Sequence, residues 1–165
     1  ASWPKLQWVG VTGASLPGGA DTMQADQLMF EDAAVRFDAA GIGGQAYRIY
    51  RAAFDRVPDL PGLGYWIKAM ENGTSLSTVA SGFVSSDEFI KMYGASPTNR
   101  AIVEKIYMNV LDRPGELAGI EFWTGVLDQN RSTVADVLAG FSESPENVAA
   151  LTGVMTKGIP YLPFG

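Results

Sequence analysis

The sequence predicts a mainly α-helical fold, with two tandem duplicated units of short helices preceded by a small N-terminal β-hairpin segment. One observation is a repeated stretch: YRAAFDRVPDLPGLGYWIKAM at residues 50–70 returns as YMNVLDRPGELAGIEFWTGVL at residues 107–127. Another is periodicity, because apolar residues recur at helical spacing in both copies. The third is an alternation of apolar and polar residues nearer the N-terminus, which is typical of strands.

These signals divide the chain of 165 residues into successive parts. Residues 1–44 form a β-rich segment that ends in a linker, residues 45–99 and 100–158 form two helical units, and residues 159–165 form a C-terminal tail. A chain of this length holds one domain or two small lobes. Because repeated units bury their apolar faces against one another, we expect the two units to share one core.

The N-terminal segment carries two predicted strand regions. One spans residues 5–12, and the other lies at residues 27–37, where the alternation within DQLMFEDAAVRFD predicts a hairpin. The glycine-rich AAGIGG at residues 39–44 is interpreted as a hinge-like linker. A lone hairpin is marginally stable in water, so we expect the edge of a second chain to complete the sheet.

Capping signals divide each unit into about four helices. Asp59 followed by Leu60-Pro61 predicts an N-cap with proline in the first turn, where its missing N–H is harmless. Serine and glycine supply the remaining signals. The predicted N-caps are Asp59, Ser75, Ser85 (with Glu88 in a capping box), Ser132 and Ser144, and the predicted stops are Gly94 and Gly158.

The residues shared by the two copies predict architecture rather than chemistry. Trp66 and Trp123 have apolar neighbours at helical spacing, which favours core packing over stacking on sugar rings. Gly62 and Gly119 precede them and permit close approach of the preceding helix. Structural roles are therefore predicted for Arg56, Gly62, Trp66, Arg113, Gly119 and Trp123.

The acidic residues beside these arginines admit two interpretations. A calcium site would use Asp55, Asp59, Asp112 and Glu116, since carboxylate oxygens suit a hard cation. Each loop supplies too few carboxylates for the roughly five or six ligands of an EF-hand. We therefore expect an arginine to bridge the loop carboxylates while Asp59 caps a helix, and we predict no cofactor, with calcium as the alternative.

Composition excludes several classes of function. With no Cys and no His, the chain has no disulfide, no Ser-His-Asp triad and none of the usual zinc, copper or haem ligand sets. A net charge of −6 with scattered basic residues argues against nucleic acid. No apolar run reaches the roughly 20 residues of a transmembrane segment. The start at ASWPK, without Met or signal-peptide layout, indicates a processed product or a fragment, and both fit secretion.

Paired carboxylates are the remaining candidates for catalysis. Glu143 with Glu146, or Asp87 with Glu88, would have to act as glycosidase acids. Both pairs lie in helix-start signatures, SESPEN and SSDEF, where acidic residues favour the helix dipole. We therefore predict no catalytic residue and no enzyme activity.

Aromatic residues also lie in the terminal segments outside the repeats: Trp3, Trp8, Tyr161 and Phe164. They either pack back onto the helices or form an apolar surface that a neighbouring subunit or domain covers. Both interpretations stay open, and the second makes these residues candidates for an interface.

A family resemblance rests on AAFDRVPDLPGLGYWIKAMENGTSLSTVASGFVSSDEF and NVLDRPGELAGIEFWTGVLDQNRSTVADVLAGFSESPEN. Their shared pattern resembles domain-of-unknown-function family 4214, over about residues 45–150 and twice. That family is similar to the helical repeats of phycobilisome linkers and recurs in bacterial S-layer, RTX-type and other secreted surface proteins. The second copy departs from the pattern, because DRPGELAG lacks one residue of RxPDxxG and has Glu116 where Asp59 stands.

The resemblance implies a secreted module of the bacterial cell surface and implies no enzymatic activity. We therefore expect a non-catalytic structural or interaction module that acts in assembly (self-association, S-layer-like or filament-like) or in adhesion, with itself or another surface protein as partner. The alternative is a glycan- or lipopolysaccharide-binding anchoring domain. A carboxylate-dependent hydrolase is the third and least favoured class.

Overall fold

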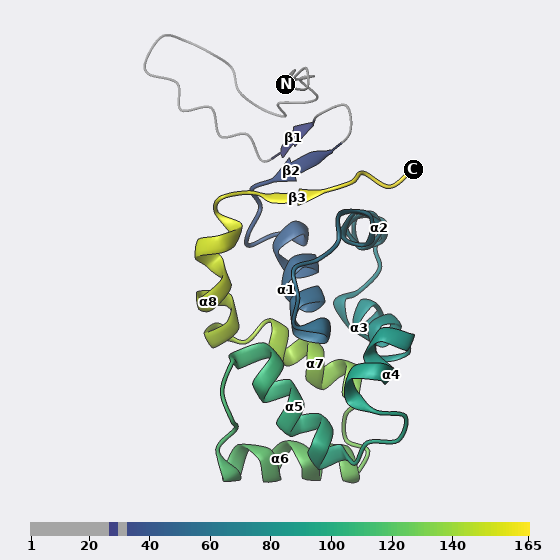
Figure 1. Cartoon of the computed structure of the whole chain (residues 1–165), viewed down its shortest axis with the longest axis vertical. Helices are drawn as coiled ribbons and strands as arrows, with labels where there is room; N and C mark the ends of the chain where they lie inside the picture. Colours follow the sequence, from purple (N-terminus) through teal and green to yellow (C-terminus); the bar gives the residue numbers. More distant parts are fainter. Residues whose placement is uncertain (1–26, 30–32) are drawn as a thin grey trace.

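The computed structural model describes residues 27–29 and 33–165, and this part of the protein is mainly helical (Figure 1). The first unit contains α1 (Ile42–Phe54), α2 (Leu60–Glu71), α3 (Leu76–Val84) and α4 (Asp87–Tyr93). The second unit contains α5 (Asn99–Leu111), α6 (Leu117–Asp128), α7 (Val134–Ser142) and α8 (Pro145–Met155). The predicted mainly α-helical fold with a small β-hairpin is confirmed.

A small antiparallel sheet closes one end of the helices, at the top of Figure 1. Its strand order is β1 (Gln27–Met29), β2 (Ala34–Arg36) and β3 (Ile159–Tyr161). The first two strands form the hairpin predicted at residues 27–37. The strand region predicted at residues 5–12 lies outside the described residues.

The third strand corrects the expectation that a second chain completes the sheet. β3 comes from the predicted C-terminal tail and pairs with β2, so that Tyr161 lies opposite Ala34. Gly158, predicted as the stop of the last helix, lies beyond the end of α8 and turns the chain into β3 with φ +107°. Ile159 and Tyr161 are buried while Pro160 between them is exposed. The hairpin thus gains its third strand from its own chain.

Most helix starts follow the predicted caps. Three predicted N-caps are confirmed, each accepting a hydrogen bond from a backbone N–H of the first turn: Asp59, Ser75 and Ser144. The predictions of Ser85 and Ser132 are wrong by one residue, because Ser86 and Thr133 are the caps. Ser85 instead donates to the carbonyl of Ser81 at 2.6 Å, in the last turn of α3. Two adjacent hydroxyl residues carry the same capping signal in the sequence.

The interpretation of residues 39–44 as a hinge-like linker is wrong, because α1 begins inside this stretch. The carboxylate of Asp38 accepts a hydrogen bond from the backbone N–H of Gly43 at 3.0 Å. A Cβ on Gly44 would lie 1.8 Å from the carbonyl oxygen of Ala39. These glycines therefore allow the chain to pack closely where the sheet joins the first helix.

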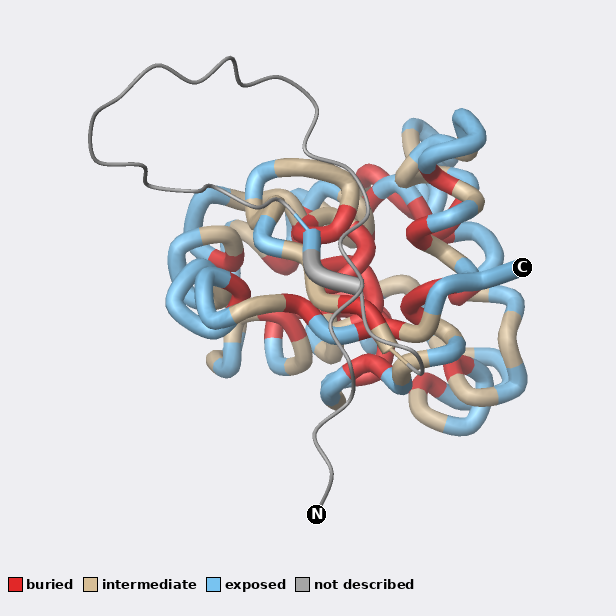
Figure 2. The backbone as a smooth tube through the Cα atoms, turned by 90° about the horizontal axis from the view of Figure 1, so that it is seen from above, coloured by how far each residue is buried: buried red, intermediate tan, exposed pale blue. Residues whose placement is uncertain are grey.

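The two helical units share one hydrophobic core, and buried segments gather at the centre of the molecule in Figure 2. Equivalent helices pack on each other across the boundary between the units, α1 on α5 and α3 on α7. α2 packs on α1 beside the sheet, and α6 packs on α5 at the opposite end (Figure 1). Fully buried side chains come from both units, among them Ile49, Leu63, Ile67, Val79, Val103, Ile106, Val137 and Leu138.

A buried ion pair also joins the units. Arg48 on α1 has a side chain that is 3% exposed, and its Nε and Nη2 atoms each donate to a carboxylate oxygen of Glu143 at 2.7 Å. Its Nη1 atom donates to the carbonyl oxygen of Ala39 at 2.6 Å. The equivalent positions of the other unit hold Lys105 and Ser85, so this pair occurs once in the described chain.

Candidate functional site

The repeated loop motif places one arginine in the same setting in each unit. Arg56 follows α1, and its Nε and Nη2 donate to the two oxygens of Glu88 at 2.6 and 3.0 Å. Arg113 follows α5, and its Nε and Nη2 donate to the two oxygens of Glu146 at 2.8 and 3.0 Å. Each glutamate lies in the first turn of its unit's fourth helix. The motif arginine therefore ties the loop between the first two helices to the start of the fourth.

Electrostatics of the first loop follow from these contacts. The hydrogen bond from Arg56 lowers the pKa of Glu88. The pKa of Asp59 is also lowered, chiefly by the hydrogen bond from the Tyr50 hydroxyl and also by that from the backbone of Gly62. Burial, together with the hydrogen bond to Asp59, raises the pKa of Tyr50 to about 12. The network holds a charged arginine, two ionised carboxylates and a neutral phenol at neutral pH.

The second loop uses the same plan with one substitution. Glu116 occupies the N-cap of α6 without a side-chain capping bond, and it accepts a hydrogen bond from Arg113 Nη1 at 2.8 Å. The hydrogen bond from Arg113 lowers the pKa of Glu146, and burial raises the pKa of Tyr107. A Cβ on Gly119 would lie only 2.4 Å from the hydroxyl oxygen of Tyr107. This glycine therefore makes room for the preceding helix's tyrosine.

The four calcium candidates serve different structural positions. Asp55 and Asp112 end α1 and α5 in the left-handed conformation, with φ of 46° and 51°. Asp59 and Glu116 each form an ion pair with the arginine of their loop. Within the described part of the chain, no group of three or more Asp, Glu, His or Cys side chains could hold a metal ion. Calcium therefore remains the alternative to the predicted absence of a cofactor, and a binding measurement decides between them.

The repeated tryptophans pack against the core with one face. Trp66 meets Phe83 edge-on with ring centroids 5.1 Å apart, and Trp123 meets Phe141 at 5.7 Å. Both indoles are half-buried. A Cβ on Gly82 would lie 2.8 Å from the Trp66 ring, so this glycine of α3 makes room for the indole. The motif tryptophans therefore contact their own unit's third helix.

The terminal aromatics separate into three cases. Tyr161 is 5% exposed and lies in β3 as part of the core, which favours the first interpretation, packing back onto the helices. Phe164 is 54% exposed, and its ring meets Tyr65 on α2 at 5.0 Å. Trp3 and Trp8 lie outside the described residues.

Three of the four carboxylates considered for catalysis are engaged by arginines. Glu143 pairs with Arg48, Glu146 pairs with Arg113, and Glu88 pairs with Arg56. Asp87 lies in the first turn of α4. These contacts direct each glutamate toward a cation of the same fold.

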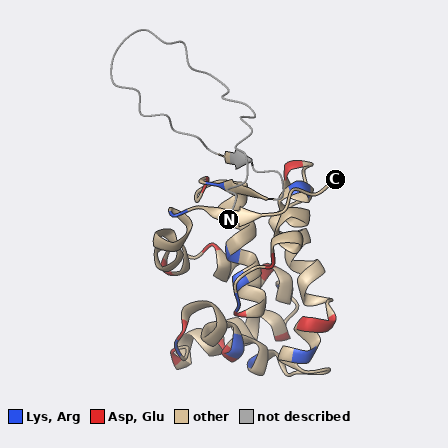
Figure 3. Cartoon of the chain, turned by 45° about the horizontal axis from the view of Figure 1, so that its top comes forward, with Lys and Arg blue, Asp and Glu red and all other residues tan. Residues whose placement is uncertain are grey.

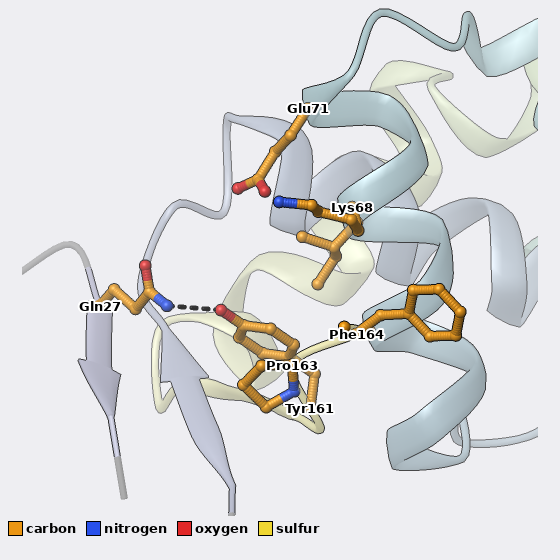
Figure 4. A pocket seen from close by; sticks show the side chains of 9 residues that line it. Gln27, Lys68, Glu71, Tyr161, Pro163 and Phe164 are labelled. Atoms are coloured by element: carbon orange, nitrogen blue, oxygen red, sulfur yellow. Dashed lines mark hydrogen bonds between the residues drawn. The ribbon is translucent and has the colours of Figure 1, made fainter.

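A pocket of about 210 Å³ lies between the sheet, α2 and the C-terminal segment (Figure 4). It is lined by Gln27, Gly64, Ile67, Lys68, Glu71, Tyr161, Pro163, Phe164 and Gly165. Sequence reasoning missed it, because its walls come from three segments far apart in the chain. The one available signal was Gly64, since the equivalent position of the second copy holds Glu121.

Comparison with protein families gives matches at residues 46–92 and 80–151 to the family described as Domain of unknown function (DUF4214). The chain belongs to this family. The first match covers α1 to α4, and the second runs from α3 through most of α8, so DUF4214 occurs here as two copies. Searches of curated proteins and of solved structures gave no match. No helix of the described residues has the length and apolar character needed to cross a bilayer.

Proposed function

We propose that this DUF4214 chain is a non-catalytic structural module of a secreted bacterial surface protein, acting in assembly through self-association or in adhesion. The observation that carries the proposal is an unequal covering of two equivalent helices. In the described structure, α2 is covered by the chain's own C-terminal segment, whereas α6, its counterpart in the second unit, is not.

The contacts that cover α2 show which equivalent residues of α6 lack such cover. Leu162 donates its backbone N–H to the carbonyl oxygen of Leu60 at 2.9 Å, and Phe164 meets Tyr65. The equivalent residues on α6 are Leu117, which is 62% exposed, and Phe122, which is 56% exposed. Exposed apolar side chains that lie together on one helix at the end of a molecule are typical of contact surfaces. In the assembly version of the proposal, the α6 end of a second copy covers them, as in the common two-fold dimers.

Composition and charge support the secreted setting. The chain has no Cys, and its net charge is −6. Lys and Arg are interspersed with Asp and Glu along the helices in Figure 3. This distribution does not build the basic stripe that nucleic acid requires, and it fits a protein that contacts other proteins or glycans. The S-layer and RTX association remains part of the proposal.

Light scattering coupled to size-exclusion chromatography tests the assembly version, over a range of concentrations with and without calcium. We expect a concentration-dependent dimer or larger species that is weakened by Leu117→Asp and by Phe122→Asp. Val154→Asp is the matched control, because Val154 is 51% exposed on α8. A strict monomer under all conditions, or equal weakening by the control, would refute self-association through α6.

The second candidate function is a glycan-binding anchoring domain. The pocket beside α2 favours it, because polar and apolar side chains line one open hollow there. A glycan array probed with the chain tests this candidate, and silence across the array would remove it. A carboxylate-dependent hydrolase is not proposed.

A further inference from the structure

The pocket beside α2 combines a fixed carboxylate with an ammonium group. Glu71 is held by Arg36, whose Nη1 donates to its Oε1 at 2.5 Å, and Arg36 is also paired with Asp38 at 2.9 Å. The side chain of Lys68, one turn earlier on α2, forms no ion pair or hydrogen bond with the side chains and backbone of the described residues. Lys68 and Glu71 face the same hollow in Figure 4. The wall thus offers a donor and an acceptor for a ligand.

The opposite wall adds a second polar group. Gln27 on β1 donates its side-chain amide to the hydroxyl oxygen of Tyr161 on β3. A tyrosine hydroxyl that accepts a hydrogen bond still has its own proton to donate. The dashed line in Figure 4 marks this contact at the edge of the pocket. Pro163, whose side chain is exposed, contributes apolar surface to the lining.

We infer that this pocket binds one neutral, polyhydroxylated ring, the sugar unit of a glycan. The charges of Lys68 and Glu71 oppose each other, so a purely anionic or purely cationic ligand would meet one unfavourable neighbour. A sugar hydroxyl both donates and accepts, and it can satisfy both side chains. The C–H groups of the ring would lie on the exposed ring of Pro163. A volume of about 210 Å³ is below that of most drug-sized sites and suits a single ring.

The site belongs to the first unit alone. At the positions of Gly64, Ile67 and Lys68, the second copy has Glu121, Thr124 and Gly125. A Cβ on Gly64 would lie 1.6 Å from the carbonyl oxygen of Leu162, so this glycine lets the C-terminal segment close the pocket. The helices are therefore common to both units, whereas the pocket forms only in the first unit, where the sheet and the C-terminal segment lie against α2.

This inference rests on the second proposed function, glycan binding, and names its site. The test is saturation-transfer NMR and calorimetry on the full chain with methyl glucoside, methyl mannoside and N-acetylglucosamine, and with glycine and acetate as charged probes. We expect weak binding of at least one sugar, reduced about tenfold or more by Lys68→Ala, since a charged hydrogen bond contributes at least that factor. Lys91→Ala, an exposed lysine on α4, is the matched control and should bind as the parent chain does.

The outcomes separate the site from the function. Sugar binding that Lys68→Ala leaves unchanged would overturn the pocket and keep glycan binding elsewhere on the chain. Binding of glycine or acetate in preference to every sugar would overturn the ligand class. If no sugar binds and the glycan array is silent, both the pocket and the anchoring function fail, while self-association is decided by light scattering. Loss on Lys68→Ala with an unchanged melting temperature supports the inference.

Discussion

Replacing Glu143 by alanine tests the buried ion pair between the two units. Arg48 would keep its charge at a site that is 3% exposed and would retain one strong acceptor, the carbonyl oxygen of Ala39. Removing one partner of a buried pair costs roughly 3–5 kcal/mol. Because the Glu143 side chain is 27% exposed and water can reach the gap, we take the lower end, about 3 kcal/mol. For a chain of this length that is a fall in Tm of about 6–12 °C.

The second unit supplies a matched control. Glu146→Ala removes the same two-pronged contact from Arg113, but these side chains are 51% and 35% exposed. An exposed pair contributes about 1 kcal/mol or less. Urea unfolding followed by circular dichroism would measure both variants. The double variant Arg48→Met with Glu143→Leu should recover most of the loss, because no buried charge remains unpaired.

The two single variants decide between burial and ion pairing as the source of stability. If Glu143→Ala and Glu146→Ala cost the same free energy of unfolding, burial of Arg48 is not the reason for the effect. If Glu143→Ala leaves the free energy of unfolding within about 1 kcal/mol of the parent chain, the cross-unit pair does not stabilise the fold.

Further predictions concern a glycine and two titrations. Gly64→Ala should displace the C-terminal segment and cost about 1–3 kcal/mol, seen as faster proteolysis of that segment. Gly140→Ala on α7 is its control: a Cβ there meets nothing within 4 Å, so we expect no loss or a gain of up to about 1 kcal/mol. Because the pKa of Glu88 is lowered in the folded protein, its carboxylate stabilises the fold at pH values above its ordinary pKa of 4.5. This stabilisation is lost as the pH falls through the lowered pKa. Urea unfolding at a series of acidic pH values should show a shallower decline in Arg56→Met, and an unchanged slope would contradict this cause. Because the pKa of Tyr50 is raised to about 12, its neutral phenol contributes fully to stability below pH 10. This contribution is lost as the pH rises through about 12. Tyrosinate absorbance and circular dichroism should then change together, whereas ionisation of all tyrosines near pH 10 without unfolding would contradict it.

Local signals in the sequence predicted the helices and most of their ends. The Asp59 and Ser144 caps are fixed by a side chain and a backbone N–H within one turn, so the sequence contains both partners. The two displaced caps, at Ser86 and Thr133, show the limit of that reasoning, because neighbouring hydroxyls compete for the same role. The glycines at the start of α1 have the composition of a linker, yet Gly44 is needed there because the chain packs closely against Ala39.

The sequence by itself determined the duplicated helical architecture, the family and the absence of thiol and imidazole chemistry, since these depend on periodicity, order and composition. Only the tertiary structure decided the third strand, the Arg48–Glu143 pair, the pocket at Lys68 and the exposed end of α6. Each of these depends on residues far apart in the chain, and nothing local in the sequence records which distant segment will pack against which. Contacts of that kind arise only when the apolar faces of both units are buried together.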